Sequence, residues 1–171
     1  YTYWYYADET GRVLRDGWHT IDGKQYYLGG SGRRLTGWID DSKFYCGEDG
    51  ARLYGWQYLE LLDSWKDDDG TVLDNYTGNY GKHAWFYFTP ETGRVRYATS
   101  GSYQEIKIDD ATYCVDERGI IQLGWIKQRG GSPVITGYKY YAEKDTDQYK
   151  MGQRVDKGWI KTVGPDEDST G

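Results

Sequence analysis

One dipeptide, Gly-Trp, recurs along the chain at intervals that suit a repeated structural unit. It stands at residues 17–18, 37–38, 55–56, 124–125 and 158–159. Each tryptophan follows a turn glycine by six or seven residues, and these glycines are Gly11, Gly32, Gly50, Gly119 and Gly152. A fixed spacing of this kind is typical of repeat proteins, in which each unit buries its apolar face against its neighbours. The sequence therefore predicts an array of small units.

A pair of aromatic residues precedes most turn glycines by five and six positions. The clear pairs are Tyr5-Tyr6, Tyr26-Tyr27, Phe44-Tyr45 and Tyr87-Phe88, and the weaker ones are Ser64-Trp65 and Tyr113-Cys114. Acidic residues and glycine between two aromatic-rich runs indicate a hairpin turn, because glycine adopts the positive φ that closes it. Gly70 and Gly93 mark two further copies, in which Tyr76 and Ser100 take the place of the tryptophan. We therefore predict seven hairpins with the turn glycines at their tips.

The composition supports many short strands, since the chain holds 19 Tyr, 8 Trp, 24 Gly and only 3 Pro. A lone hairpin is marginal in water, so the units must stack. We predict an all-β, elongated solenoid of about seven stacked hairpins. Its single array covers 1–160, with tight units over 4–56, degenerate units over 57–125, a looser terminal unit over 126–160 and a polar tail over 161–171. Residues 57–69 fit either strand or helix by periodicity, and we favour strand because Trp56 to Trp65 repeats the step from Trp18 to Tyr27.

Several classes of function are disfavoured. A net charge of −6 opposes binding to nucleic acid, and no apolar run approaches the ~18 residues that span a bilayer. The two histidines have no metal-ligand spacing around them, and no nucleophile or phosphate-loop motif is present. We expect no catalytic residue, no metal and no cofactor. Cys46 and Cys114 lie three units apart and are expected to stay unpaired.

Residues 17–28, Gly-Trp-His-Thr-Ile-Asp-Gly-Lys-Gln-Tyr-Tyr-Leu, followed by Gly32 and Thr36-Gly37-Trp38, closely resemble the cell-wall-binding repeat. This is the choline-binding repeat family of Gram-positive surface proteins, related to the glucan-binding repeats of glucosyltransferases and to clostridial toxin repeats. Residues 4–125 follow the pattern in six units. The resemblance implies a β-solenoid with ligands held between successive hairpins by a Gly-Trp tryptophan and neighbouring aromatic rings.

The candidate binding residues are the tryptophans and paired aromatics of the best-preserved units and of the terminal unit. They are Trp18, Tyr26, Tyr27, Trp38, Phe44, Tyr45, Trp56, Trp125, Tyr140, Tyr141 and Trp159. Each tryptophan also has a structural explanation, because the units have little else to bury. One stacked ring contributes on the order of 0.5–2 kcal/mol. Several weak sites on one polymer raise avidity by roughly 10²–10⁴.

The residue before each aromatic pair bears on the ligand. The choline type has a tryptophan there, whereas this chain has Trp4 in the first unit and then Gln25, Lys43, Asp63, Phe86, Thr112 and Lys139. We therefore expect neutral glycans in preference to choline. The predicted function is a non-catalytic module that binds wall polymers or glycans, secreted or at the cell surface, and cut from a larger protein. The alternatives are a choline-binding anchor to teichoic acid, an adhesin or spacer, and an accessory part of a wall hydrolase or glucosyltransferase; the oligomeric state stays open.

Overall fold

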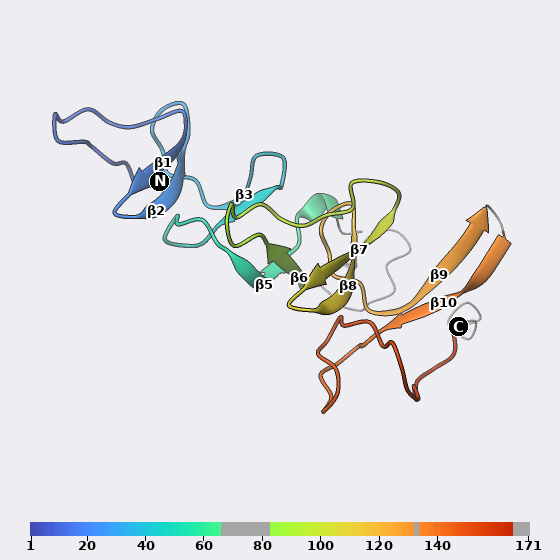
Figure 1. Cartoon of the computed structure of the whole chain (residues 1–171). Helices are drawn as coiled ribbons and strands as arrows, with labels where there is room; N and C mark the ends of the chain where they lie inside the picture. The colour runs from blue at the N-terminus through green and yellow to red at the C-terminus, as the bar shows by residue number, and fades with distance from the viewer. Residues whose placement is uncertain (66–82, 132–133, 166–171) are drawn as a thin grey trace. The chain divides into compact units, whose positions relative to one another are not determined.

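The computed structural model describes residues 1–65, 83–131 and 134–165, and all of its longer elements are β-strands (Figure 1). The strands are β1 (Gly17–Ile21), β2 (Lys24–Leu28), β3 (Gly37–Ile39), β4 (Phe44–Cys46), β5 (Gly55–Glu60), β6 (His83–Phe88), β7 (Tyr103–Ile108), β8 (Ala111–Asp116), β9 (Gly124–Gly131) and β10 (Val134–Tyr141). Consecutive strands pair into five two-stranded sheets within the described residues. The all-β hairpin fold is thus confirmed. The copy predicted at Gly70 lies outside the described residues, and the elongated solenoid of seven units stays a prediction.

The chain divides into two compact units. Unit 1 comprises Tyr1–Gln57 and Phe86–Arg96, and unit 2 comprises Tyr58–Trp85 and Tyr97–Gly171. The single array over 1–160 stays a prediction.

Each hairpin joins a Gly-Trp strand to the aromatic pair that follows it in sequence. Trp18 lies opposite Tyr27, and Trp38 lies opposite Tyr45. The β1–β2 turn is Asp22-Gly23, with φ of 51° and 79°, and two central residues at positive φ are characteristic of the type I′ turn that suits a hairpin's twist. The prediction that places the turn glycines at the hairpin tips is therefore wrong.

The turn glycines instead close the loops between successive hairpins. The Gly50 N–H donates to the Gly47 carbonyl at 2.9 Å, and the chain then forms one isolated antiparallel bridge between Cys46 and Arg52. In each repeat, we call the residue that corresponds to Arg52 in this bridge the bridge residue, and we call the residue that corresponds to Cys46 the core residue. The bridge residues are Arg34, Arg52, Val95, Ile121 and Arg154, paired respectively with the core residues Leu28, Cys46, Phe88, Val115 and Tyr141. Each of these five core residues is at most 1% exposed, so each of these repeats contributes one fully buried side chain. The first repeat differs, because its equivalent bridge joins two exposed residues, Ala7 and Val13.

The backbone N–H of the bridge residue joins its repeat to the preceding hairpin. In unit 1 the Arg52 N–H donates to the Gln25 carbonyl, and the Val95 N–H donates to the Lys43 carbonyl. In unit 2 the Arg154 N–H donates to the Thr112 carbonyl at 2.7 Å. Because this bond uses only backbone atoms, it holds neighbouring hairpins together whatever the side chain of the bridge residue is.

The same bond corrects the sequence register of the repeat that contains β5 and β6. The Ile121 N–H donates to the Trp85 carbonyl, so Trp85 occupies the place before the aromatic pair that was assigned to Phe86. The shift arises in a loop that is one residue longer than those at Gly32, Gly50 and Gly119. The Gly93 N–H donates to the Thr89 carbonyl four residues back, whereas those glycines donate three residues back. In the last repeat Tyr141 is the core residue, so the position before the aromatic pair is held by Tyr138 and not by Lys139.

Of residues 57–65, only the beginning forms a strand, and 66–69 lie outside the described residues. β5 ends at Glu60, and Asp63–Trp65 form a short 3₁₀ turn (η1) that the Trp65 N–H closes on the Leu62 carbonyl at 2.9 Å. The prediction of a second strand at Ser64-Trp65 is therefore wrong, and β5 pairs with β6 instead. An insertion between the two strands of this hairpin broke the spacing on which the prediction relied.

Candidate ligand-binding surface

The first aromatic cluster is built by two successive hairpins of unit 1. Trp18 on β1 meets Tyr27 across the hairpin, with ring centroids 5.1 Å apart and planes at 80°. It also meets Phe44 on β4 at 5.4 Å and 67°. Both contacts are edge-to-face, which is a favourable geometry for aromatic pairs. All three rings are half-buried, so three of the predicted binding residues come together here.

A cation of the chain itself lies against this cluster. The guanidinium carbon of Arg52 is 4.7 Å from the ring centroid of Trp18 and 5.3 Å from that of Phe44. The Arg52 Nε–H donates to the Tyr54 hydroxyl at 3.1 Å. A cation held over several ring faces is the arrangement by which proteins recognise quaternary ammonium groups. In this cluster the bridge residue occupies that place.

The second aromatic cluster, around Trp38, is closed by packing. Trp38 meets Tyr45 at 5.3 Å, and it meets Phe86 at 4.9 Å and Phe88 at 5.8 Å. Both phenylalanines are 0% exposed, and the bridge residue is the buried Val95 in place of an arginine. Trp38 and Tyr45 thus contribute to the packing of unit 1, and their binding role stays a prediction. Trp56 forms a similar tilted pair with Tyr87 at 5.2 Å, while Tyr26 is half-buried and joins none of the ring pairs described here.

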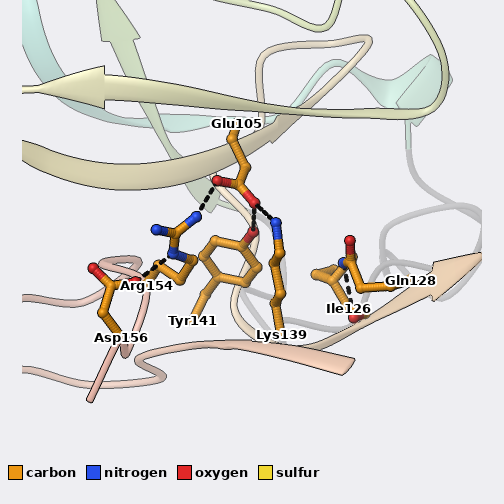
Figure 2. A network of polar contacts seen from close by, with 7 residues as sticks. All are labelled: Glu105, Ile126, Gln128, Lys139, Tyr141, Arg154 and Asp156. Carbon is orange, nitrogen blue, oxygen red and sulfur yellow. Dashed lines mark hydrogen bonds and ion pairs between the residues drawn. The ribbon is translucent and has the colours of Figure 1, made fainter. Parts of the chain in front are cut away.

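In unit 2 a carboxylate replaces the tryptophan of the repeat. Glu105 on β7 lies opposite Cys114, as Trp18 lies opposite Tyr27, so the place assigned to Ser100 belongs to Glu105. Figure 2 shows its carboxylate between Lys139 and Arg154, with which it forms ion pairs. Arg154 is the bridge residue of this repeat and also pairs with Asp156. The position that holds an arginine over rings in unit 1 therefore holds a neutralised arginine in unit 2.

The environment of Glu105 sets its protonation. Burial alone would raise its pKa, but the hydrogen bond and charge of Lys139, together with the charge of Arg154, hold the pKa below its usual value. The Tyr141 hydroxyl donates to the Glu105 Oε1 at 3.3 Å (Figure 2), and burial raises the pKa of Tyr141. Tyr141 belongs to a buried cluster with Cys114 and Ile126. Tyr141 is therefore a core residue of this unit, and its role in binding stays a prediction.

The remaining predicted aromatics of unit 2 differ in exposure. Trp125 meets Tyr140 at 4.9 Å and 61°, and its indole N–H donates to the Val163 carbonyl at 2.8 Å. Tyr140 is 9% exposed and so belongs to the buried set. Trp159 is fully exposed and takes part in none of the ring pairs described for this unit. The structure therefore brings Trp125 and Tyr140 together and leaves Trp159 apart.

An aromatic platform that the sequence analysis missed lies on β5 and β6 in unit 2. Tyr58 is 48% exposed and stacks on His83, with ring centroids 5.4 Å apart and planes at 17°. The ring centroid of Trp85 lies 5.2 Å from that of Tyr58. We call these three residues the Tyr58 platform. The sequence signal for this platform is a tryptophan directly before an aromatic pair, namely Trp85 before Phe86-Tyr87. The signal is recognised only when the register of this repeat is known.

No group of three or more metal-ligating side chains occurs among the residues that the structure describes. The described helical segment is also too short to traverse a bilayer. Cys46 and Cys114 are free and buried. Burial raises the pKa of Cys46 to about 11 and that of Cys114 to about 12, so both thiols stay protonated and unreactive at neutral pH.

Comparisons with known proteins support the fold alone. No protein-family model matches the sequence, and no curated protein matches it. Among solved structures, choline binding protein F from Streptococcus pneumoniae, in the presence of a tetrasaccharide-pentapeptide peptidoglycan analogue, matches with a TM-score of 0.61 and 21% identity. That match covers 94% of this chain and 44% of the other. A complex of the same protein with ipratropium has a TM-score of 0.54 and 24% identity over 90% of this chain and 42% of its own.

The chain therefore has the choline-binding-repeat fold, as the sequence resemblance implied. It spans less than half the length of either matched structure.

Proposed function

We propose that this chain is a non-catalytic binding module that attaches a larger secreted protein to the polymers or glycans of a cell wall. The observation that carries the proposal is the recurrence of ring clusters between consecutive hairpins, together with the exposed Tyr58 platform. The name of the matched structure, a choline binding protein with a peptidoglycan analogue, supports the same class of ligand.

The Tyr58 platform supports stacking of a neutral sugar. A pyranose ring has an apolar face that packs on an exposed aromatic ring, and its hydroxyls remain free to hydrogen-bond. Tyr58 is almost half exposed, and its stacking on His83 fixes the orientation of its ring. A single contact of this kind is worth about 1 kcal/mol. Measurable attachment then requires a polymer that engages several such surfaces at once.

The proposal is tested by pull-down on purified cell-wall polymers, α-glucan beads and choline-agarose, followed by tryptophan-fluorescence titration with the soluble form of whichever ligand retains the protein. Tyr58→Ala should weaken glycan retention at least threefold. Tyr1→Ala is the matched control because Tyr1 is fully exposed and makes no ring contact in the described structure. Failure of all three matrices to retain the wild-type chain would contradict the proposed function.

A further inference from the structure

We propose that Arg34 and Arg52 of unit 1 form an anion-binding strip that holds the negatively charged groups of an acidic wall polymer. This inference rests on the proposed function and names the ligand class that unit 1 selects. The strip is defined by these two bridge residues, which occupy the same place in consecutive repeats.

Both guanidinium groups are supported by aromatic faces. Arg52 lies over Trp18 and Phe44 and is fixed by its hydrogen bond to Tyr54. Arg34 lies over Trp4, with its guanidinium carbon 5.3 Å from the ring centroid. A stacked guanidinium keeps its in-plane N–H donors available at its edge, and that planar fork matches the oxygens of a phosphate or carboxylate.

The stems of both arginines are held by the turn glycine of the following repeat. A Cβ at Gly50 would come within 2.5 Å of the Arg34 Cδ, and one at Gly93 would come within 2.9 Å of the Arg52 Nε. The absence of a side chain at each glycine therefore leaves the space through which the arginine stem passes. An arginine confined in this way loses less conformational freedom when it binds a ligand than one that is free in solution.

Neither arginine is neutralised within unit 1. Of the ion pairs in the described part of the chain, none involves Arg34 or Arg52. The internal comparison is Arg154, the bridge residue of unit 2, whose charge is matched by Glu105 and Asp156. Two positive groups thus remain uncompensated in a chain whose net charge is −6.

The strip also disfavours the opposite ligand. A quaternary ammonium that entered the first aromatic cluster would have to displace Arg52 from Trp18 and Phe44 or lie beside it and be repelled. An anion meets no such barrier and gains a charge-assisted hydrogen bond. The bridge residue therefore sets the sign of the charge that this cluster accepts.

The test is a titration of the full chain with three soluble polymers, namely a poly(glycerol phosphate), a polygalacturonate and a neutral dextran, at low and high salt. The variants are the double substitution Arg34→Gln with Arg52→Gln, and Arg15→Gln as the control. Arg15 is an exposed arginine already paired with Asp16. We expect the double variant to bind the anionic polymers at least tenfold more weakly, to lose most of the salt dependence, and to bind dextran unchanged.

The two anionic polymers distinguish phosphodiester from carboxylate groups as the source of the charge, and binding of either one through the arginines supports the strip. Wild-type binding to an anionic polymer that the double variant retains in full would overturn the inference, as would no binding to either polymer. In both cases retention on neutral glycan that depends on Tyr58 would leave the proposed function intact. Loss of every interaction would remove both.

Discussion

Replacing Gly50 by alanine should destabilise unit 1 more than the same substitution at Gly23, although both glycines lie at nearly the same positive φ. Gly50 has φ of 84° and Gly23 has φ of 79°. A left-handed conformation costs an alanine roughly 1–2 kcal/mol at either site. The two positions differ in space, because nothing lies within 4 Å of a Cβ at Gly23, whereas one at Gly50 would meet the Cδ, Nε and Cγ of Arg34 at 2.5, 2.7 and 2.9 Å.

The steric part of the cost can be separated from the backbone part. Inserting a methyl group into an occupied site costs about 1–3 kcal/mol, so Gly50→Ala should lose about 2–5 kcal/mol in total and Gly23→Ala about 1–2 kcal/mol. Arg34→Ala should remove only the steric part. A double-mutant cycle of Gly50→Ala with Arg34→Ala should therefore show a coupling of about 1–3 kcal/mol.

Urea unfolding followed by tryptophan fluorescence and by far-ultraviolet circular dichroism measures these losses. Equal destabilisation at Gly50 and Gly23 would refute the argument that the turn glycine makes room for the arginine stem. The same conclusion would follow if the cost at Gly50 persisted unchanged in the Arg34→Ala background.

Three further substitutions test the clusters. Arg52→Ala exposes the faces of Trp18 and Phe44 and should produce saturable fluorescence quenching by millimolar choline that the wild type lacks; identical titrations would contradict the occupied cluster. Phe86→Ala should cost about 3–5 kcal/mol in urea unfolding, since Phe86 is 0% exposed and packs on Trp38, and a loss under 1 kcal/mol would contradict that packing. Glu105→Gln should cost about 1–2 kcal/mol at pH 7 and progressively less in acid. The pKa of Glu105 is lowered in the folded chain, so its stabilisation is fully present above the ordinary value of 4.5 and is lost as the pH falls through the lowered pKa; a pH-independent difference would exclude the ion pairs as its cause.

The sequence was sufficient to predict the fold class because turn chemistry and aromatic spacing are local properties. Four of the five Gly-Trp dipeptides begin a strand, at Gly17, Gly37, Gly55 and Gly124. The turn glycines in the described residues have positive φ, as the repeat predicts. The pairing of strands was not predictable in the same way. A strand such as β2 has a possible partner on each side, and the long ladder to β1 and the single bridge to Arg34 look alike in sequence.

Insertions account for the errors in the later repeats. The loop that ends at Gly93 is one residue longer than those at Gly32, Gly50 and Gly119, which shifted the expected aromatic pair and concealed Trp85. A longer connection before β7 moved the tryptophan place from Ser100 to Glu105. The ion pairs of Glu105 reach residues 34 and 49 positions away, and no local spacing indicates partners at that distance.

The bridge residue explains how one repeated scaffold can present different chemistry along its length. The backbone N–H of the bridge residue donates a hydrogen bond to a carbonyl of the preceding hairpin, so this bond does not constrain the side chain. The place is filled by arginine over aromatic rings at Arg52, by valine against phenylalanines at Val95, and by arginine in an ion-pair network at Arg154. The residue in the Gly-Trp place changes with it, from Trp18 to Glu105. Ligand selection in this chain is therefore expected to depend on the joint identity of these two positions in each repeat, and the number of tryptophans alone is a poor guide to it.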